Sequence, residues 1–285
     1  MCGYEILAVN ESTKPLAPEE ALSMLGRALP RIIAAVAEAK EADGPIFFSK
    51  YDIKDGFWIM CSEEGAEWNF AYVLPAEEDD EVEIFVPTSL QMGWTLSPAY
   101  FCVGSETGRD VAQALVAKTF GALPEHRLEK KAFHQDGKMI LTDIAAWKEA
   151  DEDFFLFMFE TFIDDYIALA QTTKVENLMH LTRSVMHGIH SVFPPDTVTN
   201  DGMGEPISEK KLYKEEGLWQ YRKEILGWLF DGASRCIKLP QDKQDKIDKI
   251  LKDMLRKGRH GKILFKDFEK IVGKLRHASI GIPAG

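Results

Sequence analysis

The sequence predicts an α+β protein built around an antiparallel sheet. One apolar run at 46–53 is typical of a buried strand, and two further runs flank Asp164-Asp165 as the arms of a β-hairpin do. Helices are expected between and after these strands, at 97–118 from its Ser97-Pro98 start and at 174–192 from helical spacing. Because strict alternation of strand and helix is missing, the order favours a split βαβ plan over a doubly wound parallel sheet.

In the N-terminal half, apolar residues at helical spacing predict helices within 17–43, where Pro30 must start a second helix or kink the first. The buried strand at 46–53 follows. Shorter strands are expected at 67–74 and 82–87. Ser97-Pro98 predicts a helix start, with Ser97 as the N-cap, and the helix should run to about residue 118.

The second half begins with a polar stretch, 121–150, that we interpret as an insertion or long loop. The hairpin at 154–170, the helix at 174–192, two short strands near 217–222 and 224–230, and two amphipathic helices after Pro240 complete the order. His187 and His190 share a helix face but lack a nearby third ligand, so we interpret them as surface or core histidines.

The composition is globular, with 285 residues, 45% hydrophobic and 28% charged. The net charge is 34 − 46 = −12, but between Lys238 and Arg276 the count is 13 basic and 6 acidic residues, a net of +7. The remainder then carries −12 − 7 = −19. A basic C-terminal module on an acidic body is compatible with a phosphate-binding surface, and a solvated pair of helices is the alternative.

No apolar run is long enough to cross a bilayer, and the N-terminus has neither a basic nor an apolar leader region. The four cysteines form no CxxC pair. These observations predict no membrane partner and an intracellular protein, in the cytoplasm or nucleus, that is not secreted.

Acidic residues end two of the predicted strands. Asp52 follows the apolar run in Tyr51-Asp52-Ile53-Lys54-Asp55-Gly56-Phe57, and a buried carboxylate there needs a counter-charge such as a divalent cation. Asp164 and Asp165 sit at the hairpin tip, where repulsion would raise the pKa of one of them unless a cation neutralises the pair. An ordinary strand-end Asp and plain turn residues are the alternatives.

A third element, Gln91-Met92-Gly93-Trp94-Thr95-Leu96-Ser97-Pro98, places a permissive glycine shortly before a helix start. In this order the three elements resemble the reverse transcriptases of retrotransposon-type elements: the first palm motif, the template and nucleotide grip, and the double-aspartate motif. Leu226-Gly227-Trp228 is similar to the primer grip. Lys210 or Lys211 would be the lysine that commonly precedes that grip. The sequence does not distinguish between them, and we assign Lys211 to the expected substrate site.

The resemblance implies a polymerase palm, a ferredoxin-like antiparallel sheet with helices, at 46–232 with the insertion at 121–150. Partial fingers would occupy 1–45 and a helical thumb 233–285. It implies RNA-directed DNA polymerisation, in which a nucleotidyl group passes from a dNTP to a primer 3′-hydroxyl with two Mg²⁺ ions, or Mn²⁺ in their place. The partners would be an RNA or DNA template with its primer, and dNTPs. The chain would belong to a longer polyprotein with an RNase H domain.

The resemblance also assigns the site residues. Asp52, Asp164 and Asp165 would be catalytic, and with the Ile53 carbonyl they would hold the metal ions. Phe57 would pack under the incoming sugar and exclude a 2′-hydroxyl. The remaining substrate contacts would come from Ile53, Asp55, Gly56, Gln91, Met92, Gly93 and Lys211, and the primer grip would comprise Leu226, Gly227 and Trp228.

Two departures from the family pattern affect this hypothesis. Met92 replaces the Gln or Phe that is more common before the glycine, and Gln91 lies one position early. Only 51 residues precede Asp52, which is short for the fingers. The alternative is therefore an inactive or co-opted remnant that binds nucleic acid or protein. A nucleotidyl cyclase or DNA-templated polymerase with a palm fold is a third reading, which the grip motif disfavours.

Overall fold

The computed structural model describes residues 8–16, 23, 26–75, 81–118, 122–135, 138–139, 155–195, 204–259, 261 and 263–281. Within these ranges the chain mixes helices and sheets, which is compatible with the α+β class. Its elements, in chain order, are α1 (Val9–Ser12), η1 (Lys14–Leu16), α3 (Ala28–Glu38), η2 (Glu41–Asp43), β1 (Ile46–Asp52), η3 (Gly56–Ile59), η4 (Ala66–Phe70), β2 (Tyr72–Val73), β3 (Ile84–Phe85), α4 (Ser97–Val116), η5 (Glu129–Ala132), β4 (His134–Gln135), β5 (Lys138–Met139), β6 (Phe155–Phe162), β7 (Asp165–Thr172), α5 (Val175–Val192), α7 (Glu209–Tyr213), β8 (Arg222–Ile225), β9 (Trp228–Asp231), β10 (Cys236–Lys238), α8 (Gln241–Arg259) and α9 (Phe265–Ser279).

The central sheet has three antiparallel strands in the order β1-β7-β6. The hairpin predicted around Asp164 is confirmed, since Phe162 pairs with Asp165 and only Ile163 and Asp164 lie between the strands. Strand β1 lies against the other side of β7 in a register that pairs Asp52 with Asp165. The three predicted acidic residues therefore meet at one end of this sheet.

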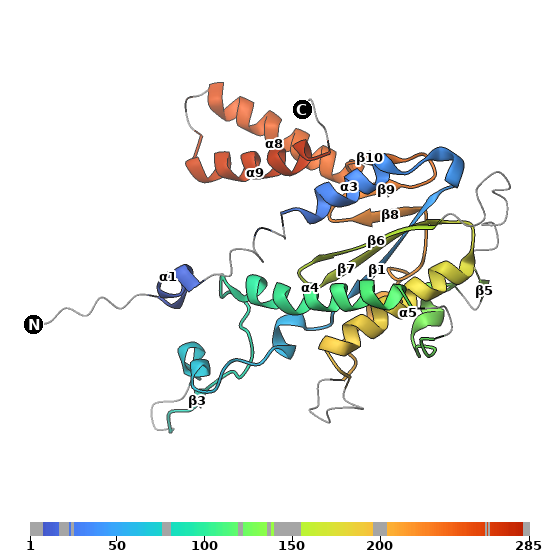
Figure 1. Cartoon of the computed structure of the whole chain (residues 1–285). Coiled ribbons are helices and arrows are strands. Elements are labelled where there is room, and N and C mark those ends of the chain that lie inside the picture. The colour runs from blue at the N-terminus through green and yellow to red at the C-terminus, as the bar shows by residue number, and fades with distance from the viewer. Residues whose placement is uncertain are drawn as a thin grey trace, which may run out of the picture.

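Helices α4 and α5 cover one face of the sheet (Figure 1). The tyrosines of the strands reach them through hydrogen bonds: the Tyr166 hydroxyl donates to the Ser105 carbonyl at 2.9 Å, and the Tyr51 and Thr182 hydroxyls lie 3.2 Å apart. The two helices approach closely at Gly188, where a Cβ would stand 2.7 Å from the Gly108 carbonyl oxygen. A small residue is needed there because no side-chain atom fits between the helices.

The opposite face is covered by α3 and by a second antiparallel sheet, β10-β9-β8. Alternation along the strands explains the division, because residues such as Phe48 and Leu169 face this second core while their neighbours face α4 and α5. Trp228 and Phe230 of β9 fill the core with Ile32 of α3. Burial on both faces accounts for the continuous apolar run that predicted β1.

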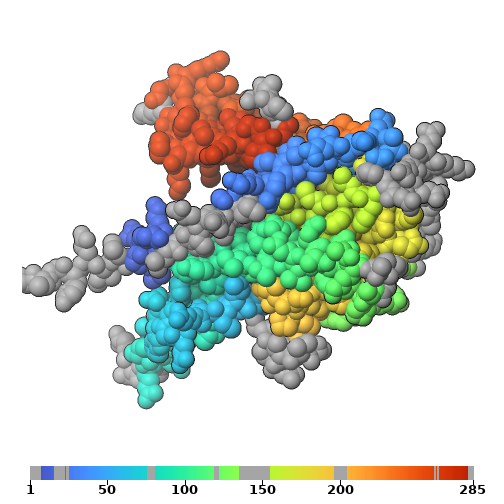
Figure 2. Space-filling view, in the orientation of Figure 1, coloured from blue at the N-terminus to red at the C-terminus, as the bar shows by residue number. Residues whose placement is uncertain are grey.

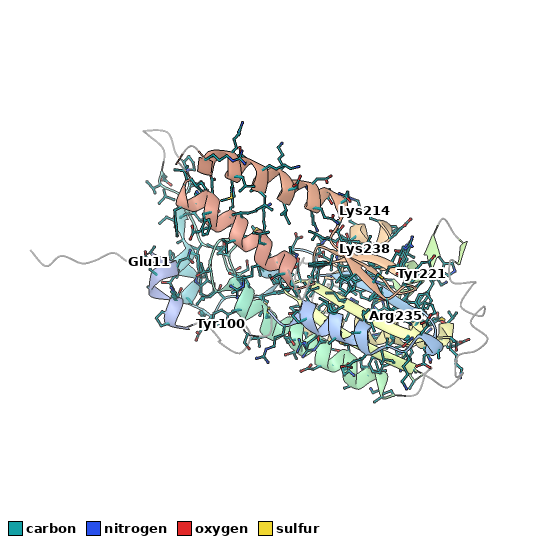
Figure 3. The ribbon with its side chains drawn as sticks, turned by 90° about the horizontal axis from the view of Figure 1, so that it is seen from above. Glu11, Tyr100, Lys214, Tyr221, Arg235 and Lys238 are labelled. Carbon is teal, nitrogen blue, oxygen red and sulfur yellow. The ribbon has the colours of Figure 1, made fainter. Side chains whose placement is uncertain are left out.

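Two lobes extend from this body. The pair α8 and α9 forms one lobe, and the segment that holds β2 and β3 forms another (Figure 2). Seen from above, Glu11 and Tyr100 lie towards one end of the molecule, and Tyr221 and Arg235 towards the other (Figure 3). Helices were expected after Pro240 and around Phe268, and both are confirmed.

The strands predicted at 67–74 and 82–87 are much shorter in the structure. Residues 66–70 form a 3-10 helix, and only Tyr72–Val73 pairs with Ile84–Phe85. Both members of this ribbon are exposed, with Tyr72 at 50% and Ile84 at 57%. A two-stranded ribbon without a core behind it extends poorly, which explains the difference.

Two local predictions also need correction. Helix α4 begins at Ser97 as expected, but the Ser97 hydroxyl donates to the Gln91 carbonyl at 2.7 Å instead of capping the helix. The strand predicted at 224–230 is interrupted by a turn at Leu226 and Gly227, whose φ angles are 47° and 84°. Two successive positive φ angles are typical of a tight hairpin turn, and the glycine accepts one without strain.

Some predictions fall on residues that are not described, namely those for 17–22, 24–25, 76–80, 140–154 and 196–203. Of the interpreted insertion, residues 122–135 and 138–139 are described, and they hold η5, β4 and β5. Within the described ranges, none of the helices combines the length and apolar character that a membrane crossing requires.

Candidate functional site

The candidate site is built by the ends of β1 and the β6–β7 hairpin. Asp52 is the last residue of β1 and Asp165 the first of β7, and they are direct antiparallel partners, so both side chains lie on the same face of the sheet. Asp164 lies in the turn, and its carbonyl accepts a hydrogen bond from the Ile53 N–H at 2.9 Å. The sequence placed these residues in separate motifs, and the register brings them together.

Backbone strain marks the same turn. Ile163 has a φ of 57°, a left-handed conformation that a β-branched residue rarely adopts. Such a conformation costs of the order of 1–3 kcal/mol and persists where the surrounding structure enforces it. Here the Ile163 side chain packs against the core on the α4 side, so the strain accompanies the exact placement of the two aspartates.

Asp52 is nearly buried, with 6% of its surface exposed. Burial raises its pKa to about 6, the Lys211 ammonium opposes that rise, and the charges of Asp164 and Asp165 add to it. Burial likewise raises the pKa of Asp165, with Lys50 acting against it. The expected rise within the Asp164-Asp165 pair therefore falls on Asp165, and its main cause is burial.

The structure distinguishes the two candidate lysines. Lys211, on α7, donates a hydrogen bond from its Nζ to Asp52 Oδ1, whereas Lys210 next to it is exposed. Burial would lower the pKa of Lys211, but the contact with Asp52 outweighs it and raises that pKa. Lys211 is thus the lysine that the fold brings to the aspartates.

Lys50 and Glu216 belong to the site but were not expected from the sequence. The Lys50 Nζ lies 3.5 Å from Asp165 Oδ1 and 3.3 Å from Glu216 Oε2. A signal was present, because Lys50 stands two residues before Asp52 in an apolar strand and must therefore share its face. Glu216 lies in the turn after α7, and no local sequence pattern predicts that this turn returns to β1.

Oxygen ligands are present at the site, but they do not form a complete metal centre. Among the described residues, no three His, Cys, Asp or Glu side chains are grouped so as to hold a metal ion. Asp165 Oδ1 is buried and accepts no hydrogen bond, although it faces the Lys50 ammonium. An orphaned carboxylate oxygen of this kind is an available ligand position.

The residues after Asp52 approach the same turn. Asp55 is exposed, with a φ of 53°, and Gly56 lies so close that a Cβ there would stand 2.9 Å from the Phe101 ring and 3.5 Å from the Asp164 Cβ. Phe57 is half-buried and packs edge-on against Phe101, with ring centroids 5.6 Å apart. The 53–57 segment is therefore near the aspartates, and part of the Phe57 ring belongs to the core.

The expected grip loop, residues 91–93, is exposed at Met92 and packs beside the N-terminal segment. Met92 is 75% exposed, and Gly93 has a φ of 96°. Two contacts of this region are with the N-terminal segment: Asn10 donates from Nδ2 to the Gly93 carbonyl at 3.1 Å, and its Oδ1 accepts from the Thr95 N–H at 2.9 Å. Gln91 donates from Nε2 to the Ser89 carbonyl at 2.7 Å.

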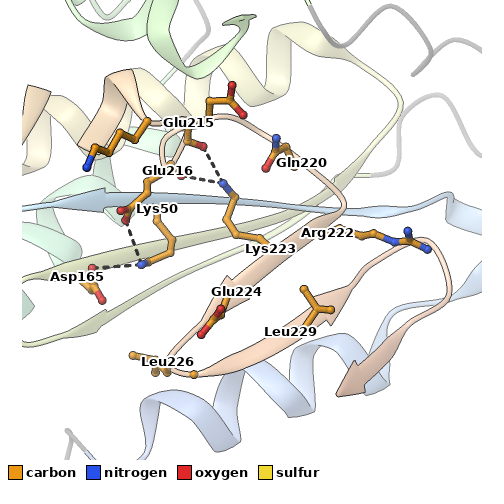
Figure 4. Close-up of a pocket in the computed structure, with 12 residues that line it drawn as sticks. Lys50, Asp165, Glu215, Glu216, Gln220, Arg222, Lys223, Glu224, Leu226 and Leu229 are labelled. Atoms are coloured by element: carbon orange, nitrogen blue, oxygen red, sulfur yellow. Dashed lines mark hydrogen bonds and ion pairs between the residues drawn. The ribbon is translucent and has the colours of Figure 1, made fainter. Parts of the chain in front are cut away.

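A pocket of about 550 Å³ opens between the aspartate edge and the β8–β9 hairpin (Figure 4). Leu226 and Gly227, at the hairpin turn, line it together with Asp165, Lys50 and Lys223. The Lys223 side chain donates to the carbonyls of Glu215 and Glu216, and burial lowers its pKa to about 8. The pocket is therefore lined by positively and negatively charged side chains beside the aspartates.

Trp228 differs from its two neighbours in the expected primer grip. Only 1% of it is exposed, and it packs in the second core, with its ring centroid 6.0 Å from that of His277. Leu226 and Gly227 face the pocket, while Trp228 anchors their turn to α9. Lys243 of α8 adds a second anchor, by donating to the Gly227 carbonyl at 3.0 Å.

Comparison with known proteins does not assign the chain to a family. No family model matches the sequence, and no curated protein matches it either.

Proposed function

We propose that the chain is the palm and thumb of an RNA-directed DNA polymerase that extends a primer with dNTPs. The observation that carries the proposal is the meeting of Asp52, Asp164 and Asp165 at one sheet edge, with Lys211 in contact with Asp52. The palm assignment, the fingers and the thumb rest on the resemblance of the motifs. The antiparallel sheet with helices α4 and α5 on one face supports it.

The donor chemistry of the site fits Mg²⁺. Carboxylate oxygens are its preferred protein ligands, and Asp165 Oδ1 is a buried oxygen without a hydrogen bond. Asp52, Asp164 and Asp165, with the Ile53 carbonyl, would hold the ions. When bound, two Mg²⁺ ions would activate the primer 3′-oxygen and neutralise charge on the leaving pyrophosphate.

The chain's own residues would bind and orient the substrates. Lys211 supplies the positive charge that Asp52 faces in this structure, and its ammonium would also contact the phosphates of the nucleotide. Leu226 and Gly227 present a hairpin turn beside Asp165, where a primer end would lie. The basic α8 and α9 would contact duplex phosphates.

Primer extension tests the proposal. Wild-type chain is given poly(rA)/oligo(dT), dTTP and Mg²⁺, and compared with Asp164→Asn and with Asp110→Asn, a matched change at an exposed position of α4. Extension that persists in Asp110→Asn and disappears in Asp164→Asn supports the polymerase. Extension retained in Asp164→Asn would overturn the proposed chemistry.

A binding module without polymerase activity is the second candidate. The observation that favours it is the pairing of Asp52 with Lys211, which already gives this carboxylate a counter-charge. Duplex binding by a wild type that extends no primer, even at millimolar Mg²⁺ or Mn²⁺, would support this candidate.

A further inference from the structure

A buried chain of side chains joins three separate segments beneath the candidate site. His126, from the stretch before η5, lies with its Nε2 3.1 Å from the Nδ1 of His190 on α5. The His190 Nε2 in turn lies 2.7 Å from Oε1 of Glu205, which precedes α7. His126 is 6% exposed and the Glu205 side chain 8%, so these polar groups depend on one another for partners.

The direction of hydrogen-bond donation along these side chains follows from the groups at the two ends of the series. The Leu128 N–H, which can only donate, points at His126 Nδ1 from 3.2 Å, so the His126 proton resides on Nε2. That proton is donated to His190 Nδ1, and His190 Nε2 then carries the proton donated to Glu205. Burial, with His190 and His187 nearby, lowers the pKa of His126 to about 4, in agreement with a neutral ring.

Glu205 connects this series of side chains to the backbone of the segment that precedes α7. Its Oε1 also accepts the Ile207 N–H at 2.9 Å, and its Oε2 pairs with Arg127. Arg127 further contacts Glu209 of α7 at 3.2 Å. Burial alone would raise the pKa of Glu205, but the hydrogen bonds from His190 and Ile207 outweigh it and lower that pKa.

The held segment leads directly to Lys211. The Pro206 carbonyl accepts the Lys54 N–H at 2.7 Å, and the Ser208 N–H donates to the Asp52 carbonyl at 2.8 Å. The Ser208 carbonyl then accepts the Lys211 N–H at 3.1 Å, within the first turn of α7. The position of Lys211 against Asp52 is therefore set by a strap that begins at Glu205.

We propose that Glu205, oriented by His190 and Arg127, is a positioning residue that holds α7 and sets Lys211 beside Asp52. This proposal has two parts. The structural part is that Glu205 holds the strap, residues 205–211, in place. The catalytic part is that this hold positions Lys211 for the reaction, and it rests on the proposed function. The two parts are tested by separate measurements, so that a failure of one can be distinguished from a failure of the other.

The first measurement is amide hydrogen exchange of the peptide that covers 205–213, which needs no polymerase activity. Glu205→Ala removes both acceptors and should speed exchange there at least roughly tenfold, as local opening becomes easier. Glu205→Gln keeps an Oε1 that accepts from Ile207 and His190, so its exchange should stay close to wild type. Glu176→Ala, an exposed change at the start of α5, is the matched control. Unchanged exchange in Glu205→Ala would overturn the proposal, whatever the polymerase assay shows.

The second measurement is a double-mutant cycle in primer extension. Glu205→Ala should lower kcat/KM for the nucleotide about tenfold, because the strap positions Lys211, whose ammonium would contact the nucleotide phosphates. In a Lys211→Ala background the same change should have no further effect. An equal loss in both backgrounds would show a merely structural role and overturn the catalytic part. A wild type that extends no primer would refute the proposed function and the catalytic part, while hydrogen exchange still decides the strap.

Discussion

Asp52 is held where its charge is disfavoured. Its pKa is raised to about 6 in the folded chain, mainly by burial, against a usual value of 3.8. Below pH 3.8 the carboxyl is neutral in both folded and unfolded chains, and no penalty arises. Between pH 3.8 and about 6 the unfolded chain ionises this carboxyl while the folded chain keeps it protonated, so stability falls across this window and the full loss is reached above about pH 6. The charge of Asp52 therefore destabilises the fold above this pH.

Asp52→Asn should consequently make the metal-free protein more stable at pH 8, by at most about 3 kcal/mol, since each pKa unit corresponds to ~1.4 kcal/mol. The gain should shrink towards pH 4, and primer extension should be lost. Urea unfolding at pH 5 and pH 8 measures it, with Asp110→Asn as the exposed control. A variant less stable than wild type at pH 8 would contradict the assigned cost of the Asp52 charge.

Phe57 combines a packing role with the proposed contact to the sugar. Because its ring is half-buried against Phe101, Phe57→Val should cost about 1–2 kcal/mol in stability. If the ring also blocks a 2′-hydroxyl, the ratio of dNTP to rNTP incorporation should fall at least roughly tenfold. Trp58→Val, a change at the exposed neighbour, is the control. A ratio that stays the same would leave Phe57 with its packing role alone.

The contact between helices α4 and α5 tolerates little added volume. An alanine at Gly188 would bring its Cβ within 2.7 Å of both the Ala112 Cβ and the Gly108 carbonyl oxygen. Backbone and a short side chain cannot move aside, so Gly188→Ala should destabilise the fold by about 1–3 kcal/mol. Gly273→Ala on α9 meets nothing within 4 Å and should be neutral or stabilising by up to ~1 kcal/mol. Thermal unfolding of both variants makes the comparison, and equal effects would refute the close packing.

The same elements show how far the sequence could predict this structure. The strands β1, β6 and β7 followed from apolar runs, helix α4 from its Ser97-Pro98 start, and helix α5 from helical spacing, because each of these elements buries apolar residues. The ribbon of β2 and β3 did not, because exposed residues such as Tyr72 leave no pattern of burial to detect. The aspartates were identifiable from their strand ends. Glu205, Glu216 and Lys223 were not, because their roles come from segments that return to β1 from distant parts of the chain.

Across the whole molecule, charge is divided between an acidic body and a basic C-terminal module. Lys238 to Arg276 carries a net +7, while the remaining chain carries −19. The module coincides with α8 and α9, which form a lobe of their own and contact the body at the Leu226-Gly227 turn and at Trp228 (Figure 2). Under the proposed function, a lobe of this charge beside the Leu226-Gly227 turn would hold a duplex whose primer end reaches Asp165.

Binding of a primer–template duplex should therefore depend on α9 and on salt. Lys270 and Lys274 are exposed and one helical turn apart, so both can face the same backbone. If each neutralises one phosphate, changing both to Ala should weaken binding across sequences and reduce the slope of log Kd against log salt by about 2. Fluorescence anisotropy with a labelled duplex between 50 and 200 mM salt, roughly the range over which such contacts weaken, measures the slope.

The control removes the same charge elsewhere. Lys14 and Lys118 are exposed on the body, outside the basic module, and changing both to Ala alters the net charge of the chain equally. We expect this control to keep the wild-type slope, because diffuse charge steers association without forming fixed phosphate contacts. Equal losses in the two double variants would mean that overall charge, and not α9, holds the duplex. A wild type whose affinity does not change with salt would remove the basis for the thumb altogether, since every phosphate contact releases counterions.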